Sequence, residues 1–149
     1  MTKRHFIFSG FCVLLLNLFS SCRKEKTVDP APVISFESIS PGQVKEYQDA
    51  ITIVLAYQDS DGDLGENTPS AKNVFITDSR NGITYEYRLN QLAPDNSTIA
   101  IKGKVNVVLN NTAITDGSAS QSYTYSLYVK DRAGHSSAPV TTTAITVVK

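Results

Sequence analysis

Hydrophobic and polar residues alternate along most of the chain after residue 32, which is the pattern of half-buried β-strands. In the clearest example Ile51, Ile53, Leu55 and Tyr57 share one face of a strand. Similar runs predict strands over residues 33–36, 51–57, 72–77, 83–89, 99–109, 123–129 and 140–148. The period of a long amphipathic helix is absent, and at most one or two helical turns are expected over residues 43–50.

Turn signals between these runs indicate how the strands connect. Asn81-Gly82 lies between two of them, and this dipeptide favours a tight hairpin whose two turn residues have positive φ. Gly103, inside the fifth run, predicts a β-bulge. Seven short strands separated by turns are typical of a sandwich. We therefore predict an all-β fold, a single antiparallel seven-stranded immunoglobulin-like β-sandwich, over residues 33–149.

The first 21 residues have a different pattern, which predicts an export signal. Lys3 and Arg4 precede an apolar run over residues 6–19, which is shorter than the span of about 20 residues that a membrane helix needs. Small residues and Cys22 follow. This ending resembles the lipobox of bacterial lipoproteins, and the resemblance implies that Cys22 becomes the first residue of the mature protein and carries lipid. The alternatives are an ordinary secretory signal or an uncleaved short anchor.

Residues 22–32 are then interpreted as the lipidated cysteine and a tether. Residues 23–32 are charged, contain proline and have no apolar period. Ten residues reach at most about 33 Å, so the domain would stay close to the membrane. The predicted location is the cell envelope. Surface lipoproteins of Bacteroidetes often carry an acidic tag after the cysteine, and the basic residues found here favour the periplasmic face of the outer membrane over the cell surface.

Charge and cysteine content exclude several functions. The chain has 14 basic and 14 acidic residues, so it lacks the broad basic surface of a nucleic-acid-binding protein. Loss of Lys3 and Arg4 with the signal leaves 12 basic against 14 acidic residues, a net charge of −2. If Cys12 is removed and Cys22 is acylated, the mature chain has neither a free thiol nor a disulfide.

An acidic loop is the clearest chemical signal. Asp59, Asp61 and Asp63 alternate directly after the second predicted strand. Like charges this close repel unless a cation lies among them, and carboxylate oxygens suit Ca²⁺. An EF-hand would have glycine and glutamate where this chain has Leu64 and Ser70, so that motif is excluded. The alternative is a solvated turn, since Asp, Ser and Gly are ordinary turn residues.

A second loop, residues 131–136, follows the sixth predicted strand and contains Asp131 and His135. In an immunoglobulin-like sandwich both loops lie at the same end, so Asp131 is expected to complete a calcium site with Asp59, Asp61 and Asp63. The two segments, DSDGDLG and DRAGHS, resemble those of small Bacteroidetes lipoproteins with a DGDGDLG-like run and a later DxAGN-S run. The resemblance implies an immunoglobulin-like or fibronectin III-like fold and a calcium site. His135 stands where those proteins usually have Asn.

The sequence predicts no enzyme, because common catalytic motifs are absent and the mature chain has a single histidine, His135, on a loop. We predict a non-enzymatic, lipid-anchored, calcium-stabilised module of the cell envelope that binds or scaffolds a protein or glycan partner. The alternative is a glycan-binding accessory lipoprotein in which Tyr85 and Tyr87, on one face of a strand, contact sugar. Packing inside the sheet is the other interpretation of these two tyrosines. Lys102 and Lys104 would protect an edge strand against casual pairing.

Overall fold

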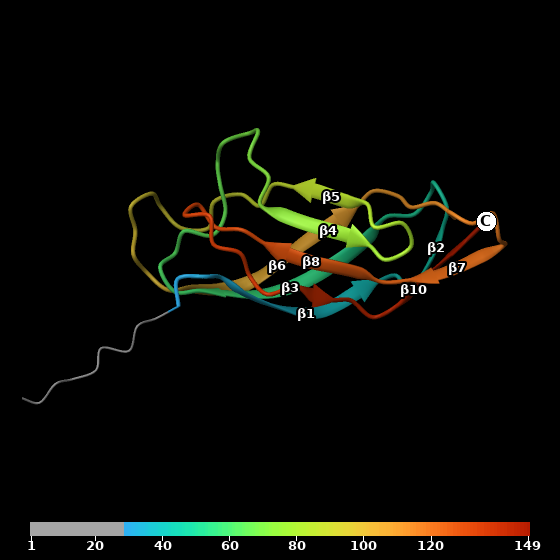
Figure 1. The fold of residues 1–149 in the computed structure, drawn as a ribbon, viewed down its shortest axis with the longest axis horizontal. Coiled ribbons are helices and arrows are strands. Elements are labelled where there is room, and N and C mark those ends of the chain that lie inside the picture. Colours follow the sequence, from blue (N-terminus) through green and yellow to red (C-terminus); the bar gives the residue numbers. More distant parts are fainter. Residues whose placement is uncertain (1–28) are drawn as a thin grey trace, which may run out of the picture.

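The structure, a computed structural model, describes residues 29–149. The predicted signal, Cys22 and most of the tether lie outside these residues. The described chain forms ten strands and no helix (Figure 1), and hence no helix of the length and apolar character needed to cross a membrane. The strands are β1 (Val33–Ser40), β2 (Gln43–Lys45), β3 (Ile51–Asp59), β4 (Val74–Asp78), β5 (Thr84–Tyr87), β6 (Ile101–Leu109), β7 (Ser120–Tyr123), β8 (Tyr125–Val129), β9 (Val140–Thr141) and β10 (Ile145–Val148). The predicted all-β class is confirmed.

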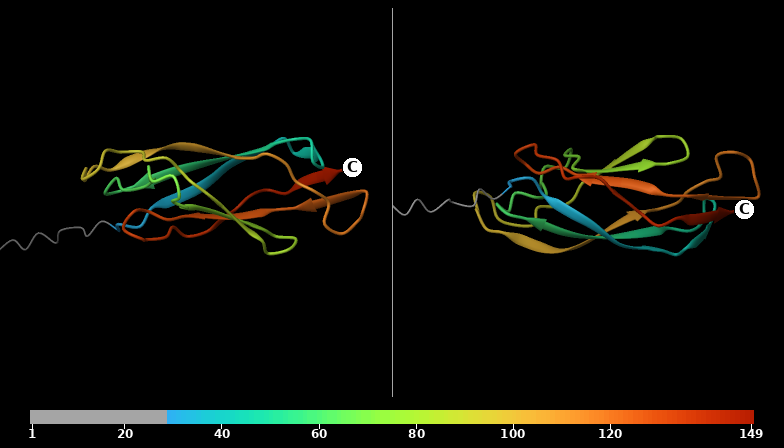
Figure 2. Two further views of the ribbon diagram at one scale, coloured as in Figure 1. Left: turned by 90° about the horizontal axis from the view of Figure 1, so that it is seen from above. Right: turned by 60° about the horizontal axis from the view of Figure 1, so that its bottom comes forward.

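The strands pair into three sheets, ordered β1-β3-β6, β5-β4-β8-β9 and β2-β10-β7. Every pairing is antiparallel except that of β2 with β10, which is parallel. Figure 2 shows the β1-β3-β6 sheet on one side of the molecule and the strands β8 to β10 on the other.

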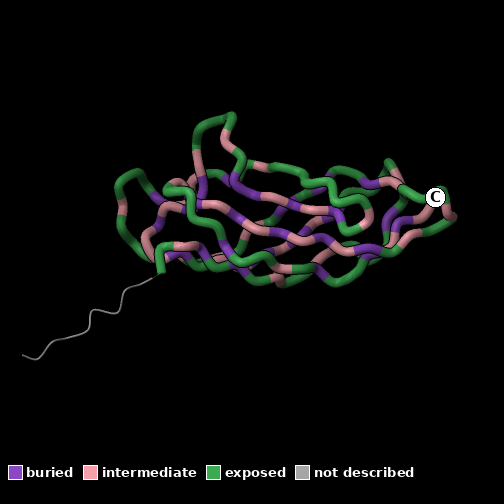
Figure 3. The backbone as a smooth tube through the Cα atoms, viewed as in Figure 1, coloured by how far each residue is buried: buried purple, intermediate pink, exposed green. Residues whose placement is uncertain are grey.

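One hydrophobic core lies between these layers. Ile51, Ile53 and Leu55 of β3 and Ile76 and Leu127 of the facing sheet are completely buried. Their alternation with less buried neighbours appears as a striped tube in Figure 3. Burial of each such side chain stabilises the fold by about 1.5–3 kcal/mol. The third sheet adds Val44, Ile145 and Val147 to the same cluster.

The number of strands differs from the predicted seven. Residues 43–45 form β2 instead of a helical turn, because Val44 is buried where the segment pairs with β10. The last two predicted strands are each divided, at Thr124 and at residues 142–144. At these breaks the ladder is replaced by local contacts: the amide of Tyr125 donates to Thr142 Oγ1, and the amide of Thr142 donates to the Tyr125 carbonyl.

The predicted hairpin is present between β4 and β5, but its turn differs from the expected two-residue form. The segment between the two strands spans residues 79–83, and only Gly82 in it has a positive φ, of 70°. The carboxylate of Asp78 accepts a hydrogen bond from the Arg80 amide, and the Asp78 carbonyl accepts one from Gly82. These bonds hold the longer loop.

The bulge predicted at Gly103 is also wrong. The β3–β6 register runs without a shift, and the irregularity lies instead in β1 between Phe36 and Ser38. Gly103 has a different role, because a Cβ at this position would lie 2.8 Å from the hydroxyl of Tyr57. Glycine therefore lets the Tyr57 ring lie against β6.

Candidate metal centre

The acidic loop begins at Asp59, the last residue of β3, at the end of the domain where residue 29 enters (Figure 1). Leu64 anchors the loop, since its side chain is completely buried in the core. The Leu64 amide donates a buried hydrogen bond of 2.7 Å to Asp59 Oδ2. The loop between these two residues is therefore closed on itself, and Asp61 and Asp63 lie within it.

Three carboxylates converge in this loop. One oxygen each from Asp59, Asp61 and Asp63 lies within 4.8 Å of the other two. The Oδ1 atom of each is buried and has no hydrogen-bond partner among the described residues. Asp59 as a whole is only 2% exposed. An unsatisfied buried polar group costs about 1–3 kcal/mol, and more when it is charged, so three together favour a bound cation.

The electrostatics agree with this arrangement. Burial is the main cause that raises the pKa of Asp59, and the neighbouring Asp61 and Asp63 raise it further, against the opposing hydrogen bond from Leu64. Burial also raises the pKa of Asp63, and the charge of Asp131 adds to the increase. Without a cation, the cluster resists complete ionisation.

Two glycines make the tight path of the loop possible. Gly62 and Gly65 have φ angles of 78° and 90°, a region that other residues rarely adopt. A Cβ at Gly62 would collide with the carbonyl of Ile99, and one at Gly65 would collide with the carbonyl of Asn90. Both glycines therefore allow neighbouring backbone to pack directly against the acidic loop.

The loop that contains Asp131 contacts the acidic loop, so the two segments that were expected at one end of the domain do meet. The amide of Ala133 donates to Asp63 Oδ2 at 3.0 Å, and the amide of Arg132 donates to the Asp63 carbonyl at 3.2 Å. The Arg132 guanidinium also donates to the Gly65 carbonyl at 2.9 Å. Arg132 directly follows Asp131 in the sequence, but no local signal there indicated its contact with the acidic loop.

The carboxylate of Asp131 is not among the three convergent groups. Its side chain is fully buried, and Oδ1 accepts a hydrogen bond of 2.7 Å from the His135 amide. Its Oδ2 lies 3.0 Å from His135 Nδ1. Asp131 therefore closes its own loop and lies beside the cluster, a role that differs from the predicted fourth ligand. His135 contributes to this loop closure through both its backbone and its ring.

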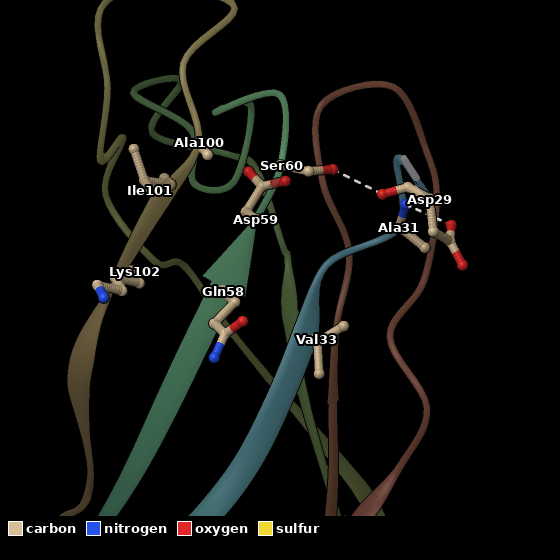
Figure 4. A pocket seen from close by; sticks show the side chains of 9 residues that line it. All are labelled: Asp29, Ala31, Val33, Gln58, Asp59, Ser60, Ala100, Ile101 and Lys102. Atoms are coloured by element: carbon tan, nitrogen blue, oxygen red, sulfur yellow. Dashed lines mark hydrogen bonds between the residues drawn. The ribbon is translucent and has the colours of Figure 1, made fainter. Parts of the chain in front are cut away.

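A groove of about 510 Å³ borders the acidic loop at Asp59 and Ser60 (Figure 4). The entering chain forms one wall, and the start of β6, with Ile101 and Lys102, forms another. The Ser60 hydroxyl donates a hydrogen bond of 2.6 Å to the Asp29 carbonyl. This contact joins the acidic loop to the first described residue of the chain, and no local sequence signal indicates it.

The tyrosines of β5, β7 and β8 occupy two environments. Tyr85 is 39% exposed and Tyr87 is half-buried, and they pair with the buried Ile76 and Val74 on the core-facing side of the sheet edge. Tyr123 and Tyr125 are buried with their rings edge to face, 5.2 Å apart. On β6, Lys102 and Lys104 are exposed.

Comparison of the chain with protein-family models, with curated proteins and with solved structures found no match.

Proposed function

We propose that the acidic loop binds one Ca²⁺ ion through Asp59, Asp61 and Asp63. The observation that carries this proposal is the convergence of three carboxylates, each of which has one buried oxygen without a hydrogen-bond partner among the described residues. Ca²⁺ accepts six to eight oxygen ligands in flexible geometry, so carbonyls or waters would complete the shell. Hard oxygen donors favour Ca²⁺ over the softer transition metals, and Mg²⁺ would demand a more regular octahedron.

The ion is proposed to have a structural role. It would neutralise the acidic loop, against which Arg132 and Ala133 of the second loop are held, and so would strengthen one end of a domain predicted to have no disulfide. Asp131 would act as a positioning residue, because its hydrogen bonds to His135 shape the loop that contacts Asp63.

We infer further that the three sheets form one immunoglobulin-like sandwich. Support comes from the two breaks. β7 and β8 are separated by Thr124 alone, and Thr142, which lies between β9 and β10, still hydrogen-bonds to Tyr125 at the start of β8. Treated as single strands, β7–β8 and β9–β10 would join two of the sheets into one layer opposite β1-β3-β6. The predicted seven strands then correspond to this arrangement, with β2 as an addition.

The whole protein is proposed to be a non-enzymatic, lipid-anchored binding or scaffolding module of the cell envelope. The anchor rests on Cys22 and the apolar segment before it. The periplasmic face of the outer membrane is the favoured location. Mass spectrometry of the protein purified from membranes tests the anchor: a lipid-modified Cys22 at the mature N-terminus is expected, and Cys22→Ser should release the protein from membranes. An unmodified Cys22 in membrane-bound protein would reject the lipoprotein assignment.

Thermal unfolding in EDTA and in calcium tests the metal site. At a free calcium concentration 100 times the Kd, binding should add about 2.7 kcal/mol and raise the Tm by about 10 °C. Asp61→Asn keeps the side-chain shape and removes one charged ligand, so the calcium-dependent increase should be largely lost. Magnesium at the same concentration should have a smaller effect.

Glu86→Gln provides the matched control, because it removes one carboxylate from an exposed position of β5, outside the cluster. It should keep the full response to calcium. An equal Tm of the native chain in EDTA and in calcium would refute the metal site, and the acidic loop would then be an ordinary turn.

A further inference from the structure

A second hollow, of about 200 Å³, lies between β5 and the segment that follows β6. Tyr85 and Tyr87 line it from the strand, and Asn81 lines it from the hairpin turn. Asn111 and Thr115 contribute from the other side. None of these residues belongs to the acidic cluster, so the hollow is independent of the proposed metal site. The hairpin turn points away from the end at which residue 29 enters (Figure 1).

Arg80 also lines this hollow, and its buried side chain is held by several hydrogen bonds. Its Nε donates to the Asp78 carboxylate, with which it forms a salt bridge of 2.6 Å through Nη2. Nη1 donates to the Ala113 carbonyl at 2.6 Å, and Nη2 donates to Thr112 Oγ1 at 3.0 Å. Its remaining donor lies 3.3 Å from the Gln121 side chain. All five N–H donors of the guanidinium are therefore used, and its charge is neutralised locally. Arg80 therefore helps to shape the hollow but offers no unpaired positive charge to a ligand, which argues against an anionic ligand.

The rim carries neutral groups that remain available. Asn81 uses its side-chain oxygen to accept a bond from the Ile83 amide, which leaves its NH₂ group free to donate. Within the described residues, the hydroxyls of Tyr85 and Tyr87 and the side-chain amide of Asn111 make no hydrogen bond. Aromatic rings beside amide and hydroxyl groups match the alternating apolar faces and hydroxyl edges of a sugar ring.

We propose that this hollow binds a single sugar ring of a neutral glycan. A volume of about 200 Å³ lies below the range of about 300–1,000 Å³ that is typical of drug-sized ligands, so it suits one ring. Tyr85, 39% exposed, supplies the accessible aromatic face, and Tyr87 lies deeper. Asn81 and Asn111 donate to and accept from the ring hydroxyls. The arrangement gives the glycan-binding alternative a defined location.

Titration of the ¹⁵N-labelled protein with the methyl glycosides of glucose, galactose and mannose tests the proposal. At least one glycoside should shift backbone amide signals within residues 80–87 and 109–115, with a Kd in the millimolar range that is common for single small ligands. Tyr85→Ala should weaken this binding by about tenfold or more, since truncation of an aromatic anchor has such effects. Tyr47→Ala, which removes the ring of a residue that is 70% exposed and does not line the hollow, should leave it unchanged.

Asn111→Ala is the second variant, since Asn111 is exposed and outside every strand, so the fold should tolerate its loss. It should also weaken binding. Mannitol, an open-chain polyol, distinguishes ring recognition from a general polyol effect. The proposal fails if the three glycosides leave these signals unchanged, if mannitol produces the same shifts, or if both variants bind as tightly as the native chain. Repeating the titration in EDTA and in calcium separates this outcome from that of the metal site.

Discussion

The two oxygens of Asp59 lie in different surroundings. Oδ2 accepts a hydrogen bond from the Leu64 amide and closes the loop, whereas Oδ1 is buried and has no donor among the described residues. One carboxylate therefore both shapes the loop and contributes to a concentration of negative charge. Closing the loop needs only one oxygen that accepts the Leu64 amide. Adding negative charge to the cluster is favourable only when a cation is bound. Replacement of Asp59 by asparagine separates these two roles. The amide oxygen can still accept the Leu64 hydrogen bond, whereas the unpartnered, charged oxygen is replaced by a neutral NH₂ group.

Asp59→Asn should stabilise the protein in EDTA at pH 7, by about 1 kcal/mol, because it removes a buried and unpaired charge. The native pKa of Asp59 is raised above the reference value of 3.8, so the folded state binds more protons than the unfolded state just above that pH. In EDTA the free energy of unfolding of the native chain should therefore fall as pH rises through this window. Asparagine does not titrate, so the variant should lack this part of the fall.

Urea denaturation in EDTA between about pH 4 and 8 measures this difference. In saturating calcium at pH 7 the order should reverse, since the native chain regains stability from the ion and the variant does not. Parallel pH profiles of the two proteins in EDTA would contradict the assignment of an unpaired charge to Asp59.

At the scale of elements, the β4–β5 hairpin contains a buried ion pair. The side chains of Asp78 and Arg80 are 0% and 6% exposed, and the guanidinium lies 3.5 Å above the Tyr123 ring. The Tyr123 hydroxyl in turn donates to Thr112 at 2.9 Å. One guanidinium thus connects three parts of the chain: the hairpin turn, strand β7, and the segment that follows β6. The hairpin is consequently attached to the rest of the molecule at its tip as well as along β4.

Arg80→Met should cost about 3–5 kcal/mol, because it leaves the Asp78 carboxylate buried without its partner. The double variant with Asp78→Asn should recover part of this loss, since no charge is then left unpaired. Lys104→Met is the control: it breaks the Lys104–Glu37 pair, whose side chains are 63% and 38% exposed, and should cost less than 1 kcal/mol. Urea denaturation measures all three. A single Arg80 variant as stable as the Lys104 variant would show that the buried pair contributes little.

The strands that could be predicted are those whose burial alternates along a continuous segment. For β3 and β6 the local pattern is sufficient, because in each strand more buried residues alternate with less buried ones. Three-residue β2 was missed, since its pairing with β10 joins segments a hundred residues apart and leaves almost no period. The hairpin was expected at the right place with the wrong turn, because the position of Arg80 depends on Ala113 and Thr112, which are distant in sequence.

The candidate metal site also has one part that could be predicted from the sequence and one part that could not. Asp59, Asp61 and Asp63 are neighbours in sequence, so their convergence could be predicted from spacing alone. The role of Asp131 could not, because it depends on the fold of its loop around His135. Sequence spacing indicates where negative charge accumulates, whereas the tertiary structure determines which carboxylate oxygens already accept hydrogen bonds.

At the scale of the whole molecule, the acidic loop and the entry of the chain lie at the same end (Figure 4). Ser60, between two of the convergent carboxylates, donates to the Asp29 carbonyl, and Asp29 Oδ1 accepts the Ala31 amide at 3.0 Å. Val33 then pairs with Gln58 of β3. An ion that orders the acidic loop would consequently also order the point at which the predicted tether joins the domain.

Calcium should therefore slow hydrogen exchange of the Ala31 amide, by about tenfold, in the native chain. Ser60→Ala should keep its calcium affinity, because the three proposed carboxylate ligands remain, but it should lose this slowing, because the hydroxyl that donates to the Asp29 carbonyl is removed. Ser97→Ala is the matched control, since it removes a similar hydroxyl bond, to the Pro94 carbonyl, in an exposed loop. Equal slowing in the native chain and in Ser60→Ala would mean that the ion stabilises its loop alone. Loss of the slowing in Ser60→Ala only would mean that the ion also orders the point at which the segment predicted to be the tether joins the domain.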